Sequence, residues 1–170
     1  MARCLIVGCG CRGIELGREL RAAGHTVRGT TRDASRSADL EAAGIEPFVA
    51  DPDRVGTLAP AFAHVGVVCV LLGSAAGSVE QLAALHGPRL GMLLERMLDT
   101  TVRGIVYEAS GDVDAELLEE GARRVRLACE RSLIPYALLT ARSGPAWPME
   151  AARAVQGVLL ARAQPPRSGA

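Results

Sequence analysis

Aromatic side chains are scarce in this 170-residue chain, at 3% of residues, although 49% of the residues are hydrophobic. The apolar content is therefore mainly alanine, leucine and valine, which suits helices packed closely on a sheet. The length corresponds to one domain, and the apolar fraction is high enough to build a hydrophobic core.

The sequence also lacks long hydrophobic runs and an excess of either charge. Without a run of about 18 apolar residues, we expect no membrane-spanning helix. A strand pattern begins at Arg3, so we expect no signal peptide. Acidic and basic residues balance at 19 each. This balance gives no indication of a nucleic-acid partner.

The five cysteines do not form a disulfide pattern. Their number is odd, and Cys4 and Cys69 fall in predicted buried strands, as is typical of a reducing, cytoplasmic protein. Cys9 and Cys11 form a Cys-x-Cys pair. No second Cys or His pair at zinc spacing accompanies them, so no metal site is predicted. We expect both to be small residues that fit beside a phosphate.

The strongest motif is Gly-x-Gly-x-x-Gly at Gly8, Gly10 and Gly13, directly after an apolar strand and at the start of an amphipathic helix. The first glycine permits a tight turn, the second lets a pyrophosphate approach the backbone, and the third lets the helix pack close to the strand. The helix N-terminus offers free N–H groups to the anion. With Cys11 and Arg12, these glycines are the predicted dinucleotide-binding turn.

The end of the second strand indicates which dinucleotide is bound. A site that prefers NAD usually has a carboxylate there, which binds the ribose hydroxyls. Here the strand ends in Thr30, Thr31 and Arg32, which could bind a 2′-phosphate, with Arg12 as a second candidate. We therefore expect NADP(H) in preference to NAD(H). Asp33 next door keeps NAD(H) open, and the arginines could instead be solvated surface residues.

Strand and helix patterns alternate along the chain. They predict an α/β fold, a doubly wound and mostly parallel Rossmann sheet with helices on both faces. The predicted strands are 3–7, 26–31, 45–50, 65–72, 103–108 and 136–140. The predicted helices are 11–23, 35–43, one that includes Val55 and Leu58, 88–99 and 114–131.

The last part of the chain departs from this alternation. Residues 1–145 are the expected NAD(P)-binding domain. Residues 146–163 are a loop and helix, with the helix over 149–162, packing on the domain or on a partner, so a homodimer stays open. Residues 164–170 are expected to be a disordered tail.

Three segments together resemble a known family. They are the glycine turn 8–13, the stretch Ala-Gly-His-x-Val-x-Gly-Thr-Thr-Arg at 23–32, and Ala-Ala-Gly-Ile-Glu-Pro at 42–47. The chain resembles extended or atypical short-chain dehydrogenase/reductase proteins, nearest to the YeeZ-like relatives of NAD-dependent epimerases and dehydratases. The resemblance implies that Asp51 approaches the adenine, that Leu72 and Gly73 line the cofactor, and that Ser110 faces the nicotinamide.

The family's Tyr-x-x-x-Lys catalytic pair is not found in the sequence. Alignment on Glu130 puts Arg126 at the lysine position and Ala122 at the tyrosine position. Arg126 keeps a positive charge, so Arg126 and Ser110 are the candidate catalytic residues. Ala122 cannot transfer a proton. The family's standard proton-transfer machinery is therefore absent, unless another acid such as Glu108 substitutes for the tyrosine.

Three functions stay open from the sequence. The first is a dinucleotide-binding or redox-sensing protein with reduced or no catalysis. The second is an active NADP-dependent oxidoreductase or epimerase with a non-standard acid and an unknown small-molecule substrate. The third is a non-catalytic interaction module that keeps the glycine turn for packing alone.

Overall fold

The computed structural model describes residues 1–163. The predicted disordered tail, 164–170, lies outside the described residues. Six strands form one sheet in the order β3-β2-β1-β4-β5-β6, and every neighbouring pair is parallel. The strands are β1 (Arg3–Val7), β2 (Thr26–Thr31), β3 (Glu46–Val49), β4 (Val67–Val70), β5 (Ile105–Glu108) and β6 (Tyr136–Leu139).

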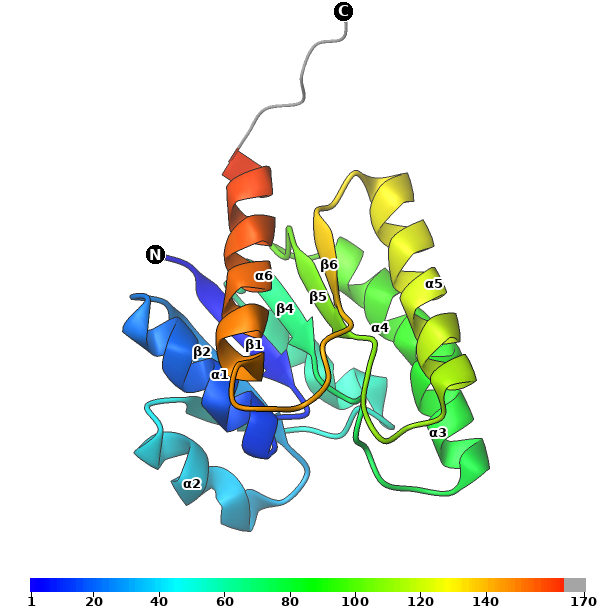
Figure 1. Ribbon diagram of the computed structural model, residues 1–170, viewed down its shortest axis with the longest axis horizontal. Coiled ribbons are helices and arrows are strands. Elements are labelled where there is room, and N and C mark those ends of the chain that lie inside the picture. The colour runs from blue at the N-terminus through cyan, green and yellow to red at the C-terminus, as the bar shows by residue number, and fades with distance from the viewer. Residues whose placement is uncertain (164–170) are drawn as a thin grey trace, which may run out of the picture.

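Helices cover both faces of this sheet (Figure 1). One face carries α1 (Cys11–Ala22), α2 (Ser37–Ala42) and α6 (Trp147–Ala163). The other carries η2 (Val55–Phe62), α3 (Val79–His86), α4 (Pro88–Leu98) and α5 (Ala115–Ser132). The predicted fold class is confirmed. Among residues 1–163, no helix is both long and apolar enough to span a bilayer.

The strand order places a crevice beside the glycine turn. β1 lies between β2 and β4, so the chain leaves β1 in one direction across the sheet and later returns to its other side. In open α/β sheets, ligands bind outside the carboxyl ends of the strands at this reversal. The turn at residues 8–10 follows β1 directly, at that edge.

Helix α3 was not anticipated from the sequence. It follows a glycine- and serine-rich loop and begins with a capping box: Ser78 Oγ accepts the Gln81 N–H at 3.2 Å, and Gln81 Oε1 accepts the Ser78 N–H at 2.8 Å. The Ser-x-x-Gln spacing is the signal that predicts such a helix start. The segment over Val55–Phe62 is 3-10 helix.

The C-terminal helix packs on the domain. It begins at Trp147, inside the segment expected to be loop, and the Trp147, Ala151, Val155 and Val158 side chains are buried against α1 and the sheet. Gly104 makes room for it, since a Cβ there would lie 2.3 Å from Val158 Cγ1. α6 therefore completes one face of the core.

Shortening a buried α6 side chain tests this packing. Val155→Ala removes two methyl groups at a fully buried position, so we expect the free energy of unfolding to fall by about 2 kcal/mol. Leu160→Ala on the same helix is the control, because Leu160 is 64% exposed, and we expect a change within about 0.5 kcal/mol. Urea unfolding measures both, and equal losses would contradict the described packing.

Candidate functional site

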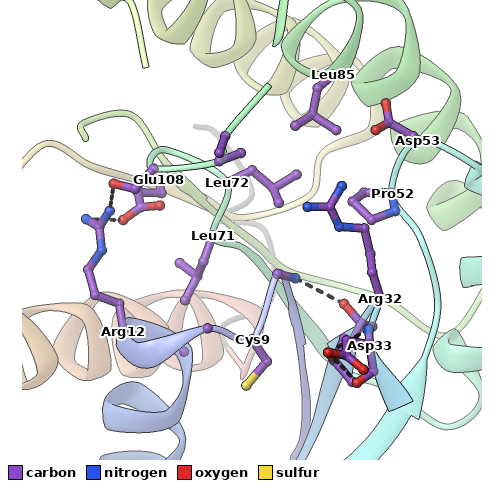
Figure 2. Close-up of a pocket in the computed structure, with 18 of the residues that line it drawn as sticks. Cys9, Arg12, Arg32, Asp33, Pro52, Asp53, Leu71, Leu72, Leu85 and Glu108 are labelled. Atoms are coloured by element: carbon purple, nitrogen blue, oxygen red, sulfur yellow. Dashed lines mark hydrogen bonds and ion pairs between the residues drawn. The ribbon is translucent and has the colours of Figure 1, made fainter. Parts of the chain in front are cut away.

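A cavity of about 520 Å3 opens at the carboxyl ends of β1, β2 and β4 (Figure 2). The glycine turn forms its floor. The end of β2 and the loop after β3 form one wall, and the loop after β4 with α3 forms the other. The predicted binding residues that line it are Gly8, Gly10, Cys11, Arg12, Gly13, Thr31, Arg32 and Leu72.

The first glycine of the turn is packed tightly against neighbouring groups, whereas the second is open. Gly8 has φ +81°, and a Cβ there would lie 2.6 Å from the Leu71 carbonyl oxygen. The Gly8 N–H donates to Thr30 Oγ1 at 3.0 Å. The position of a Cβ on Gly10, by contrast, has no atom within 4 Å. The turn is therefore fixed from below and open towards the cavity.

The third glycine of the motif lies against β1. A Cβ on Gly13 would lie 3.0 Å from Cys9 Sγ and 3.2 Å from Ile6 Cγ2. The Cys9 side chain is thus buried under α1, and burial raises its pKa to about 12. Cys9 lines the cavity, while its thiol points into the core beneath the turn (Figure 2). The expectation that Cys9 lies beside a phosphate stays a prediction. Cys11 is exposed at the helix start.

The N-terminus of α1 has no side-chain cap among the described residues. Gly10 is its N-cap, and no acidic residue lies in the first turn. The first N–H groups and the positive end of the helix dipole therefore face the cavity without a neutralising partner. This arrangement is suited to an anion.

Arginines line the wall at the end of β2. Arg32 is exposed and extends over the cavity towards Pro52 (Figure 2). Arg36, which sequence reasoning missed, also lines the cavity and pairs with Asp39 at 3.6 Å. The Asp33 carboxylate accepts the Ser35 N–H at 2.9 Å, and this hydrogen bonding lowers the Asp33 pKa. Arg36 ends the short 3-10 turn Ala34–Arg36 that follows β2. No local pattern in the sequence shows that this turn borders the cavity.

The Thr31 hydroxyl is engaged inside the same turn. It donates to the Asp33 carbonyl oxygen at 3.1 Å and accepts the Asp33 N–H at 3.2 Å. Thr31 is 9% exposed. Its role in this structure is to shape the turn that carries Arg32.

A buried ion pair closes the opposite end of the cavity. Glu108, at the end of β5, is 1% exposed, and its Oε1 lies 2.6 Å from Arg12 Nη1. Its Oε2 accepts the Gly73 N–H at 2.7 Å. Burial raises the Glu108 pKa, and the Arg12 charge and the Gly73 hydrogen bond oppose that shift. Sequence reasoning named both residues but could not pair them.

Arg12 makes two further contacts. Its Nη2 donates to Ser74 Oγ in the loop after β4, and its guanidinium lies 5.6 Å from the centre of the Trp147 ring. Such a cation–π contact is worth about 0.5–2 kcal/mol. Arg12 thus ties α1 to β5, to the β4–α3 loop and to the start of α6.

A buried hydrogen-bonded chain supports the wall on the α3 side. His86 Nε2 lies 3.1 Å from the Leu72 carbonyl oxygen, and His86 Nδ1 lies 2.7 Å from the Tyr107 hydroxyl. Because a carbonyl can only accept, Nε2 carries the proton and Nδ1 accepts from Tyr107. Burial lowers the His86 pKa. The neutral ring fixes the Leu72 backbone, which borders the cavity.

Four predicted site residues do not line the cavity. Asp51 Oδ1 accepts the Asp53 N–H at 2.9 Å, in a local turn. Gly73 lies behind the wall, where a Cβ would be 2.2 Å from the Ser110 carbonyl oxygen. The Ser110 hydroxyl donates to the Ala141 carbonyl oxygen at 2.8 Å. Arg126 lies on α5, outside the cavity lining.

Ala122 and Arg126, the residues aligned with the Tyr-x-x-x-Lys pair, both lie outside the cavity lining. Ala122 is 1% exposed and lies in the core between the sheet and α3–α5. The two tyrosines do not replace it: Tyr107 is buried, and the Tyr136 hydroxyl donates to Glu130 at 3.0 Å. The sequence contains no lysine, because all 19 residues in the combined lysine and arginine count are arginines.

Within residues 1–163, no three His, Cys, Asp or Glu side chains gather closely enough to hold a metal ion. The charged residues that line the cavity are three arginines, two aspartates and one glutamate: Arg12, Arg32, Arg36, Asp33, Asp53 and Glu108. The arrangement can hold a polyanion at the glycine turn and a further anionic group near Arg32.

The fold is shared with several solved structures. A protein proposed to be an NAD-dependent epimerase/dehydratase from Bacillus halodurans superposes with a TM-score of 0.69 at 18% identity, over 81% of this chain and 69% of that one. A short-chain dehydrogenase/reductase superfamily protein from Agrobacterium tumefaciens with bound NAD gives 0.65 at 20% identity, over 80% and 48%. Vestitone reductase from alfalfa gives 0.62 at 18% identity, over 81% and 56%.

These similarities concern the fold. The chain spans about half the length of the Agrobacterium and alfalfa proteins. No protein-family model matches the chain, and no curated protein does. The chain has the extended Rossmann fold of short-chain dehydrogenase/reductase and epimerase/dehydratase proteins, as the sequence resemblance implies. The narrower YeeZ-like assignment stays a prediction.

The buried His86 predicts a pH dependence of stability. The folded state disfavours the protonated ring. The contribution of His86 to the free energy of unfolding is therefore complete above the unfolded pKa of about 6.5, and it is lost as pH falls. Between pH 7.5 and 5.5, we expect the wild type to lose about 1 kcal/mol more unfolding free energy than His86→Gln.

The control is His64→Gln, since His64 is exposed in a loop. It should keep the wild-type slope in urea titrations across this pH range. A His86→Gln slope equal to that of the wild type would show that His86 titrates normally in the folded protein.

Proposed function

We propose that this chain binds an NAD(P) dinucleotide at the cavity above the glycine turn, and that it acts as a binding or redox-sensing protein with reduced or no Tyr-Lys catalysis. The observation that carries the proposal is the open position at Gly10 beside the uncapped N-terminus of α1. Together they leave room for a pyrophosphate and supply free N–H donors. The neighbour with bound NAD supports the same use of the fold.

The wall at the end of β2 favours NADP(H) over NAD(H). Arg32 and Arg36 both border the cavity there, so two guanidinium groups are available to a ribose 2′-phosphate. The Asp33 carboxylate points to Ser35, where it caps the 3-10 turn. Asp33 also lines the cavity, so the preference for NADP(H) rests on two guanidinium groups beside one carboxylate that already accepts a local hydrogen bond.

The missing catalytic groups favour binding over turnover. The sequence has no lysine, and the residue at the tyrosine position, Ala122, lies in the core. Ser110 donates to β6 and to the loop after it. We assign cofactor binding to residues 1–145 and a supporting role to the helix that follows.

Removal of the Arg32 side chain tests the ligand assignment. We expect the affinity for NADPH to fall roughly 10- to 100-fold in Arg32→Ala, since a charged hydrogen bond is worth about 1.5–3 kcal/mol. The affinity for NADH should change less than about threefold. Isothermal titration calorimetry gives both values.

The matched control is Arg18→Ala, which removes an exposed arginine of α1 that does not line the cavity. It should leave both affinities unchanged. Absence of binding to either dinucleotide by the wild type would overturn the proposed function, and equal losses for NADPH and NADH would overturn the 2′-phosphate assignment.

A second candidate function rests on Glu108. This buried carboxyl lines the cavity, and burial raises its pKa, as a general acid requires. The chain would then be an active NADP-dependent oxidoreductase or epimerase with a non-standard acid. Turnover of NADPH with a panel of aldehydes, ketones and sugar nucleotides, lost at least 100-fold in Glu108→Ala, would establish this function in place of the first.

A further inference from the structure

Arg12 divides the cleft at the carboxyl edge of the sheet. Its guanidinium leaves α1 and reaches Glu108 on β5 and Ser74 in the loop after β4. On one side lies the cavity above the glycine turn. On the other lies a shallower cavity of about 560 Å3, which shares Arg12 and Ser74 and is also lined by Asp112 and Ser143. The Arg12 contacts form the partition between them.

The two sides correspond to the two halves of the sheet. The first cavity is lined by residues of β2, α1, α3 and the loops after β1, β2, β3 and β4. Within residues 1–163, Glu108 is the only lining residue from β5 or β6. A dinucleotide lies across the reversal of strand order, with one mononucleotide on each half of the sheet. To continue from the glycine turn towards β5 and β6, it must pass the place that Arg12 and Glu108 occupy.

The partition is well anchored. Glu108 is 1% exposed and receives the Gly73 N–H, while the Trp147 ring lies beside the Arg12 guanidinium. Breaking one partner of a buried ion pair leaves an uncompensated charge, which is strongly unfavourable. However, Arg12 Nη1 and Glu108 Oε1 form no well-aligned hydrogen bond despite their 2.6 Å separation. The pair is therefore held mainly by the attraction between the two opposite charges, which the buried surroundings of Glu108 strengthen.

From this geometry, we infer that the site binds the adenosine diphosphate half of its dinucleotide and leaves the nicotinamide outside the first cavity while Arg12 and Glu108 are paired. The inference rests on the proposed dinucleotide binding and names which part of the ligand is recognised. A site of this kind responds to the total amount of adenine dinucleotide. It does not distinguish the oxidised from the reduced form, because the two differ only in the nicotinamide ring. Of the two roles proposed above, the inference therefore keeps dinucleotide binding and excludes redox sensing.

The wild-type protein tests the inference directly. Calorimetric titrations with NADP+, NADPH and 2′-phospho-ADP-ribose compare ligands that share the adenosine half, and NAD+, NADH and ADP-ribose form a parallel set. We expect the dissociation constants within the set that binds to agree within about threefold. Tenfold or tighter binding of either dinucleotide than of its ADP-ribose counterpart would overturn the inference.

Glu108→Gln tests whether the ion pair with Arg12 is what keeps the nicotinamide outside the first cavity. The glutamine can still accept the Gly73 N–H, but it no longer pairs with the Arg12 charge. We expect this variant to bind NADP+ at least tenfold more tightly than 2′-phospho-ADP-ribose. Glu15→Gln is the matched control. It makes the same charge change at an exposed residue that lines only the second cavity, and it should keep the equal affinities of the wild type.

The outcomes separate the two proposals. No binding of any of the six ligands to the wild type overturns the proposed function itself. Binding with a strong preference for complete dinucleotides keeps that function and overturns the adenosine-half inference. Equal affinities in both the wild type and a folded Glu108→Gln variant show that the ion pair is not the barrier. That result also overturns the adenosine-half inference. Far-ultraviolet circular dichroism checks that each variant is folded, and the wild-type comparison stands without any variant.

Discussion

The close approach of backbone to backbone at the glycine turn is the constraint on which the rest of the structure depends. Gly8 lies against the Leu71 carbonyl, and Gly29 of β2 would place a Cβ 2.7 Å from Cys9 Sγ. These contacts bring the ends of β1, β2 and β4 together and set the height of α1 above the sheet. The cavity, the exposed helix N-terminus and the reach of Arg12 all follow from that placement. A side chain at Gly8 would separate β1 from β4.

A second organising feature is the buried charge at the end of β5. An unpaired carboxylate at Glu108 would be costly in this environment, and the structure offsets that cost with Arg12 and the Gly73 N–H. The same contacts fix the loop after β4, which forms a wall of the cavity. His86 and Tyr107 fix that loop from the core side. The wall is thus held by polar groups on both sides, which suits a preformed binding site.

Local patterns in the sequence predicted the fold and much of the cavity. The glycine spacing, the alternation of elements and the arginine after β2 each depend on neighbouring residues, so they can be read directly. The pairing of Arg12 with Glu108 joins residues far apart in the sequence, and no local pattern encodes it. Ser110 was assigned by resemblance to a family. Its hydroxyl faces β6 because carbonyl acceptors of Leu139 and Ala141 lie within reach there.

Trp147 is the only tryptophan in the chain, and it lies on the Arg12 guanidinium at the boundary of the cavity. Its indole is 2% exposed, and its Nε1 has no hydrogen-bond partner among the described residues. Any movement of Arg12 changes the charge over the indole face. Tryptophan emission, excited apart from that of the two tyrosines, therefore comes from a single indole beside the Arg12 guanidinium. A rearrangement of the ion pair could thus be followed in solution without an attached label.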